Sequence, residues 1–124
     1  KAYATDLPVD LVKSALSISG LYDLEPLRHA PNVKDSLKLT PAQVRKASPA
    51  LLPAPRKGTL YCVAGGNESA EFLRHNQLIQ KAWGKKVVPV CEELPGLHHF
   101  SVLDALVDPA HRLHILAQRL LVPN

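Results

Sequence analysis

Aromatic residues are scarce in this sequence, which limits the kinds of partner that it can bind. The 124 residues include two Phe, three Tyr and one Trp, too few rings for a surface that stacks nucleic-acid bases. The formal net charge is +4, but the basic residues are scattered, and the densest groups are the pairs Arg45–Lys46 and Lys85–Lys86. Neither pair extends into the basic run that would bind a phosphate backbone. We therefore interpret the positive charge as a solvated surface and expect no nucleic-acid partner.

Long apolar runs are also absent. No stretch approaches the ~20 apolar residues that cross a bilayer, and residues 1–20 lack the apolar core and small-residue cleavage site of a signal peptide. We therefore expect no membrane association. The chain begins with Lys1 rather than methionine, which leaves open a natural start upstream of it.

Cysteine is represented by Cys62 and Cys91 alone. Two cysteines are too few for a disulfide-rich scaffold, and they are not clustered with other ligands as in a zinc site. We expect both to be reduced and buried in a cytoplasmic protein. The hydrophobic fraction of 46% indicates a globular domain rather than a disordered tail.

Three short apolar segments, 11–19, 58–64 and 86–91, indicate strands. The first strand ends at Gly20, and the second continues into a pair of glycines. Pro89 cannot donate a hydrogen bond to a neighbouring strand, so we expect the third strand at an edge of the sheet.

Helices are predicted between and after these strands. Thr40, Pro41 and Gln43 form a capping box with proline at the first helical position. A longer amphipathic helix is predicted over 69–83, and a last helix over 109–121. Residues 21–39 show no sustained period and predict a long, partly ordered loop.

The alternation of strands and helices predicts an α/β fold of three layers, with parallel strands and right-handed crossover helices. In such a sheet, chemistry gathers at the carboxyl ends of the strands. Glu68 follows the second strand and His99 follows the third. A carboxylate can orient an imidazole, and the imidazole can take a proton from a serine. Glu68 alone would also suit the start of a helix, where the dipole stabilises a carboxylate.

Four segments resemble the C-terminal half of the α/β-hydrolase family that includes kynurenine formamidase and related esterases. They are 17–26 (SISGLYDLEP), 47–49, 65–72 (GGNESAEF) and 96–100 (GLHHF). The resemblance covers nearly the whole chain and implies that Glu68 is the acid and His99 the base of a Ser-His-acid triad. Some relatives have Asp where this sequence has Glu68. The resemblance implies no metal ion and no organic cofactor.

The family's nucleophile motif, Gly-x-Ser-x-Gly, is missing from these residues. Ser17 and Ser19 lie in or at the end of a strand, without the flanking glycines of that motif. We therefore interpret residues 1–124 as the C-terminal portion of one α/β-hydrolase domain whose serine lies elsewhere. Alone, the chain is expected to be inactive and to expose a strand edge that favours aggregation or oligomerisation.

Other residues receive weaker roles. Tyr22 is predicted to line an acyl or aryl pocket. His98 is predicted either to lie at the rim of that pocket or to contact the site residues without contacting the substrate. Trp83 is interpreted as a core residue. His111 and His114 have a spacing that can bind metal, but no third ligand is nearby, so we expect surface histidines.

These observations favour a serine hydrolase of a small formamide or ester substrate. The resemblance implies hydrolysis of N-formylkynurenine, a step of tryptophan catabolism, by an arylformamidase. A carboxylesterase of broad specificity uses the same machinery and stays open, as does a non-catalytic interaction module that kept the fold. A homodimer of the full-length form is also left open.

Overall fold

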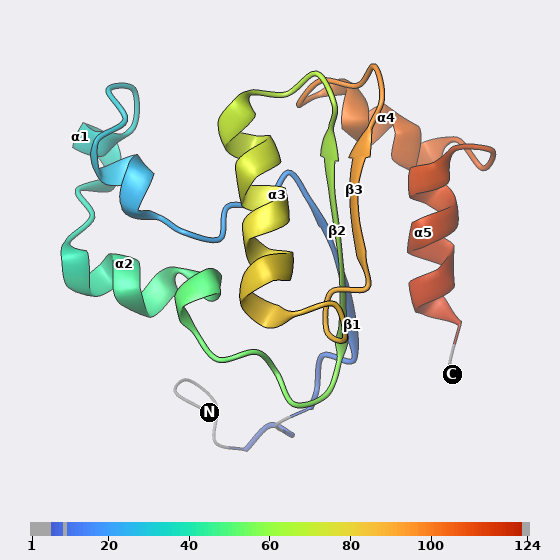
Figure 1. Cartoon of the computed structure of the whole chain (residues 1–124), viewed down its shortest axis with the longest axis horizontal. Helices are drawn as coiled ribbons and strands as arrows, with labels where there is room; N and C mark the ends of the chain where they lie inside the picture. The colour runs from blue at the N-terminus through green and yellow to red at the C-terminus, as the bar shows by residue number, and fades with distance from the viewer. Residues whose placement is uncertain (1–5, 9, 123–124) are drawn as a thin grey trace.

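The protein contains a three-stranded parallel sheet, seen in a computed structural model that describes residues 6–8 and 10–122. The strands are β1 (Ser14–Ile18), β2 (Thr59–Gly65) and β3 (Val90–Leu94), in the spatial order β1-β2-β3. Both pairings are parallel, so the predicted parallel sheet is confirmed. All three strands end at the same edge of the sheet, the upper edge in Figure 1.

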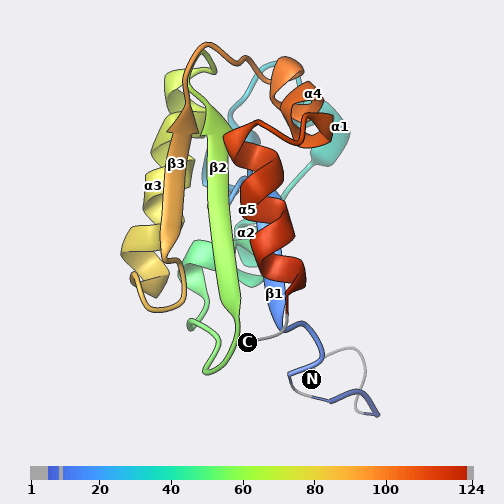
Figure 2. The same ribbon diagram turned by 90° about the vertical axis from the view of Figure 1, so that its right-hand side faces the viewer.

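Helices cover both faces of the sheet. The long helix α3 (Ala70–Trp83) packs on one face, and α4 (Ser101–Val107) and α5 (Arg112–Leu121) lie on the other (Figures 1 and 2). Successive residues of a strand point to opposite faces. On β2, Val63 accordingly belongs to the apolar cluster under α4 and α5, and Cys62 to the cluster under α3. The predicted three-layer arrangement is therefore present.

The long segment between β1 and β2 contains short helices. They are η1 (Glu25–Arg28), α1 (Lys34–Leu37), α2 (Pro41–Ala47) and η2 (Pro49–Leu51). The predicted capping box of α2 is confirmed: Thr40 Oγ1 accepts from the Gln43 amide at 3.2 Å, and Gln43 Oε1 accepts from the Thr40 amide at 2.9 Å.

The C-terminal third of the chain differs from the prediction at three elements. The third strand was expected over 86–91, but β3 begins at Val90, directly after Pro89, which has no amide hydrogen to donate. Helix α4 was not predicted; its seven residues are too few to be stable alone, and it is held by the burial of Val102 and Ala105. The last helix begins at Arg112 rather than at residue 109, because His111 occupies its N-cap.

Candidate active site

Three side chains meet at the edge where the strands end: Ser19 after β1, Glu68 after β2 and His99 in the loop between β3 and α4. The loop and the turn after β2 are bonded together, because the Asn67 amide donates to the Leu97 carbonyl at 2.9 Å. Gly65 makes this approach possible. A Cβ atom at Gly65 would lie 2.3 Å from the Leu97 carbonyl oxygen, closer than any side chain can approach.

The carboxylate of Glu68 is fully buried and has three hydrogen-bond donors. Its Oε1 accepts from the Gly65 amide at 2.8 Å and from the Ser19 hydroxyl, and its Oε2 accepts from His99 Nδ1 at 2.8 Å. Burial raises the pKa of Glu68, but the hydrogen bonds outweigh it, and this pKa lies below its ordinary value. The group is therefore ionised at neutral pH despite its burial.

The imidazole of His99 is half exposed and contacts two aromatic rings. Its ring lies 4.6 Å from that of Phe72 on α3, centre to centre, and 5.5 Å from that of Phe100. Since an ionised carboxylate can only accept, Nδ1 is the nitrogen that carries the hydrogen. Nε2 is therefore the nitrogen on which a proton can be received. A buried acid and an accessible imidazole in this arrangement can serve general base and general acid catalysis.

His98 has a different environment from its neighbour. Its Nδ1 accepts from the amides of Phe100 and Ser101, both at 3.2 Å, and its own amide donates to Ser101 Oγ at 2.9 Å. The side chain thus holds the beginning of α4. Because His99 lies between His98 and Ser101, this contact also fixes the backbone of His99.

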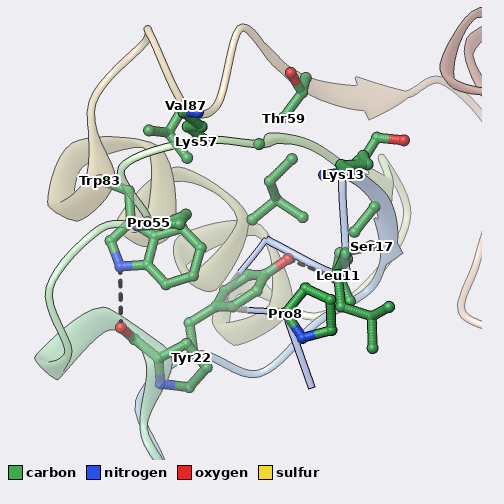
Figure 3. A pocket seen from close by; sticks show the side chains of 16 residues that line it. Pro8, Leu11, Lys13, Ser17, Tyr22, Pro55, Lys57, Thr59, Trp83 and Val87 are labelled. Atoms are coloured by element: carbon green, nitrogen blue, oxygen red, sulfur yellow. Dashed lines mark hydrogen bonds between the residues drawn. The ribbon is translucent and has the colours of Figure 1, made fainter. Parts of the chain in front are cut away.

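Tyr22 is not brought to the pair. Its side chain is buried, and its hydroxyl donates to Ser17 Oγ at 2.6 Å and lies 3.4 Å from Cys62 Sγ. Burial raises the pKa of Tyr22 strongly. The ring lines a cavity of about 490 Å³ at the opposite end of the sheet, beside the first residues of β1 and β2. Figure 3 shows Tyr22 there with Leu11 and Trp83. Tyr22 thus lines a pocket that is separate from the Glu68–His99 pair, because the chain turns back into the core after Gly20.

A second histidine–glutamate pair lies on α3 and was not found from the sequence. His75 is buried; its Nδ1 accepts from the Tyr22 amide at 2.9 Å, and its Nε2 lies 3.1 Å from Glu71 Oε1. Arg74 donates to both oxygens of Glu71, at 3.0 and 2.6 Å. This hydrogen bonding to Arg74 lowers the pKa of Glu71 to about 2. The four-residue spacing of Glu71 and His75 on a predicted helix was a signal that could have revealed the pair.

The remaining histidines of the C-terminal third bond to the backbone. His111 Nδ1 accepts from the Leu113 amide at 3.1 Å, and His114 Nδ1 lies 2.7 Å from the Leu106 carbonyl. Within residues 6–8 and 10–122, no three His, Cys, Asp or Glu side chains gather in a way that could hold a metal ion. None of the helices in the same part of the chain has the length and apolar character needed to cross a membrane.

Known proteins resemble this chain in sequence and in fold. Kynurenine formamidase of Salmo salar is 31% identical over 111 residues, which cover 82% of this chain and 37% of the relative. Kynurenine formamidase of Danio rerio is 29% identical over 108 residues, covering 82% of this chain and 36% of the relative. The chain thus spans little more than a third of the length of these relatives. No protein-family model matches it.

A solved structure supports the fold independently. A Silicibacter protein assigned as a thioesterase superposes with a TM-score of 0.76 at 22% identity, covering 89% of this chain and 40% of that protein. The chain is therefore similar in sequence to part of kynurenine formamidase, and it shares its α/β fold with part of the solved structure.

Proposed function

We propose that the natural protein containing this chain is a serine hydrolase, and that Glu68 and His99 are the acid and base of its triad. One observation carries the proposal: a buried, ionised carboxylate accepts from Nδ1 of a half-exposed imidazole at 2.8 Å. The sequence similarity to kynurenine formamidase over 82% of the chain supports the proposal independently of the geometry. The serine is supplied from outside these 124 residues.

The reaction follows from the roles of the two side chains. The serine gives its proton to Nε2 of His99 as its oxygen attacks the substrate carbonyl carbon. The imidazolium returns that proton to the leaving nitrogen or oxygen, and the bond from this atom to the carbonyl carbon breaks. Water then attacks the acyl-serine through the same imidazole and releases a carboxylic acid, which is formate when the substrate is a formamide. Glu68 keeps Nδ1 protonated and stabilises the imidazolium.

We propose N-formylkynurenine as the substrate, because the two curated relatives are kynurenine formamidases. An ester or thioester hydrolase is the second candidate, since the structural neighbour is assigned as a thioesterase. We also propose that the enzyme works in the cytoplasm. The cysteine content supports this, because two cysteines are too few for the disulfide-rich scaffold of a small secreted protein.

The test measures kcat/KM of the natural protein on N-formylkynurenine and on p-nitrophenyl acetate. Preference for the formamide supports an arylformamidase, whereas turnover of the ester alone supports the second candidate. A fluorophosphonate probe should label one serine, located by mass spectrometry in a Gly-x-Ser-x-Gly motif outside this chain. If the protein turns over neither substrate and is not labelled, the result would support a non-catalytic interaction module that kept the fold.

A further inference from the structure

We infer that Ser19 is a positioning residue, whose hydroxyl fixes the carboxylate of Glu68 so that one oxygen stays directed at His99. The inference rests on the proposed function, since it assigns a role within the same site. Ser19 follows β1, so this role would connect a third strand of the sheet to the pair.

The hydrogen bonds divide the two oxygens of Glu68 between two tasks. Oε1 takes both structural donors, the Ser19 hydroxyl and the Gly65 amide, and Oε2 is left for His99 Nδ1. Two donors on one oxygen prevent the carboxylate from rotating about its last bond. Because the group is fully buried, water cannot replace a lost donor without opening the site.

The backbone of Ser19 indicates that the hydroxyl is needed there. Its φ is 52°, in the left-handed region that glycine adopts most readily. The amide of Ser19 still donates to the Val63 carbonyl at 2.8 Å. The left-handed conformation therefore occurs at the residue that makes the last hydrogen bond between the first two strands. A glycine would meet the backbone requirement better, but it would leave Oε1 of Glu68 without its side-chain donor.

The same contacts distinguish Ser19 from a nucleophile. A nucleophilic serine must donate to Nε2 of the histidine, because that nitrogen receives its proton. The hydroxyl of Ser19 donates instead to Glu68, the partner of Nδ1 on the other side of the ring.

Ser17, two residues before Ser19 and within β1, provides a matched control. Its hydroxyl accepts from the Tyr22 hydroxyl at 2.6 Å, in the core and away from Glu68. Losing this hydroxyl removes a hydrogen bond from the α3 side of the sheet, and it leaves both oxygens of Glu68 with their donors.

The experiment compares Ser19→Gly, Ser19→Ala and Ser17→Ala in the natural protein. We expect Ser19→Gly to lower kcat by about 10-fold to 100-fold with KM within about twofold, because a displaced catalytic group costs rate rather than binding. Its melting temperature should not fall by more than that of Ser17→Ala, because glycine suits φ 52°. Ser17→Ala should keep the wild-type kcat per folded molecule.

A second readout needs no substrate. Recorded on the neutral form of the ring, the ¹⁵N shifts of His99 should be far apart in the wild type, as for a ring protonated on Nδ1 alone. In Ser19→Gly they should move together, because an unfixed carboxylate no longer selects one tautomer. Ser17→Ala should keep the wild-type shifts. Ser19→Ala gives the same comparison if the glycine variant does not fold.

Two results would overturn the inference. The first is wild-type kcat and wild-type ¹⁵N shifts in Ser19→Gly. The second is complete loss of turnover together with fluorophosphonate labelling of Ser19 in the wild type, which would make it the nucleophile. If the wild type hydrolyses neither substrate, the proposed function fails, and the ¹⁵N shifts still decide whether Ser19 positions Glu68.

Discussion

Two histidine–glutamate pairs in this protein have the same chemistry and opposite burial. In the pair at the strand ends, Glu68 is 0% exposed and His99 is 48% exposed. In the pair on α3, His75 is 1% exposed and Glu71 is 46% exposed. The donor–acceptor distances, 2.8 and 3.1 Å, differ little. What separates the pairs is which partner faces solvent.

The exposed partner determines what each pair can do. His99 presents Nε2 on an accessible ring, so it can exchange a proton with a bound molecule. His75 has its Nδ1 occupied by the Tyr22 amide and its Nε2 next to Glu71, so its ring joins α3 to the segment after β1. A third pair, His29 and Glu25, is exposed on both sides, and such pairs contribute little to stability. Proximity of histidine and glutamate alone therefore does not identify a catalytic pair.

The largest expected effect is the loss of the exposed imidazole. His99→Ala should lower kcat/KM of the natural protein by at least about 1,000-fold, because the general base is lost. The free energy of unfolding should fall by about 1–2 kcal/mol, since the buried carboxylate of Glu68 loses one of its three donors. Steady-state kinetics and urea denaturation measure the two effects. His29→Ala is the matched control and should keep wild-type activity. Near-normal turnover in His99→Ala would remove this histidine from the mechanism.

Replacing the buried acid should cost less activity than removing the base. Glu68→Gln should lower kcat about 100-fold or more, because an amide directed at His99 can donate to Nδ1 and so select the other tautomer. Stopped-flow or steady-state kinetics would measure the loss of kcat. Glu71→Gln makes the same change in the other pair and should leave kcat unchanged. Equal losses in the two variants would contradict the distinction between the pairs.

Removing the buried imidazole of His75 should lower stability and leave activity unchanged, whereas changes to the Glu68–His99 pair should chiefly lower activity. His75→Ala should destabilise the protein by about 2 kcal/mol, because the buried Tyr22 amide loses its acceptor and a cavity forms. Activity per folded molecule should be retained. Urea denaturation, followed by kinetics at a denaturant concentration where both proteins are folded, separates the two. A stable His75→Ala variant with impaired kcat would show that both pairs serve the reaction.

The smallest expected effect is on acid stability. The pKa of Glu71 is lowered to about 2, chiefly by the hydrogen bond from Arg74. Its contribution to stability is therefore complete above its ordinary pKa of about 4.5 and is lost as the pH falls toward 2. Because Glu71 is nearly half exposed, we expect less than about 1 kcal/mol. Unfolding measured between pH 6 and 2.5 should be less pH-dependent in Glu71→Gln than in the wild type. An unchanged profile would mean that other groups set the acid limit.

Local sequence signals predicted much of this fold. Thr40, Pro41 and Gln43 predicted the start of α2, because a capping box needs only residues three positions apart. The apolar period that predicted α3, and its end at residue 83, were also local signals. The pairing register of β3 was not, because it is decided by the neighbouring strand β2.

The sequence by itself determined the order of the elements and the chain positions of Glu68 and His99 at strand ends, because periodicity, caps and motifs act over a few residues. Only the tertiary structure decided which partner of each histidine–glutamate pair is buried. It also decided that Tyr22 turns into the core and that Ser19 reaches Glu68 across 49 residues of chain. These outcomes depend on contacts between distant segments, whose geometry exists only once the sheet has formed. Glu68 and His99 could therefore be singled out from the sequence, but the donors that hold the carboxylate of Glu68 in place could not.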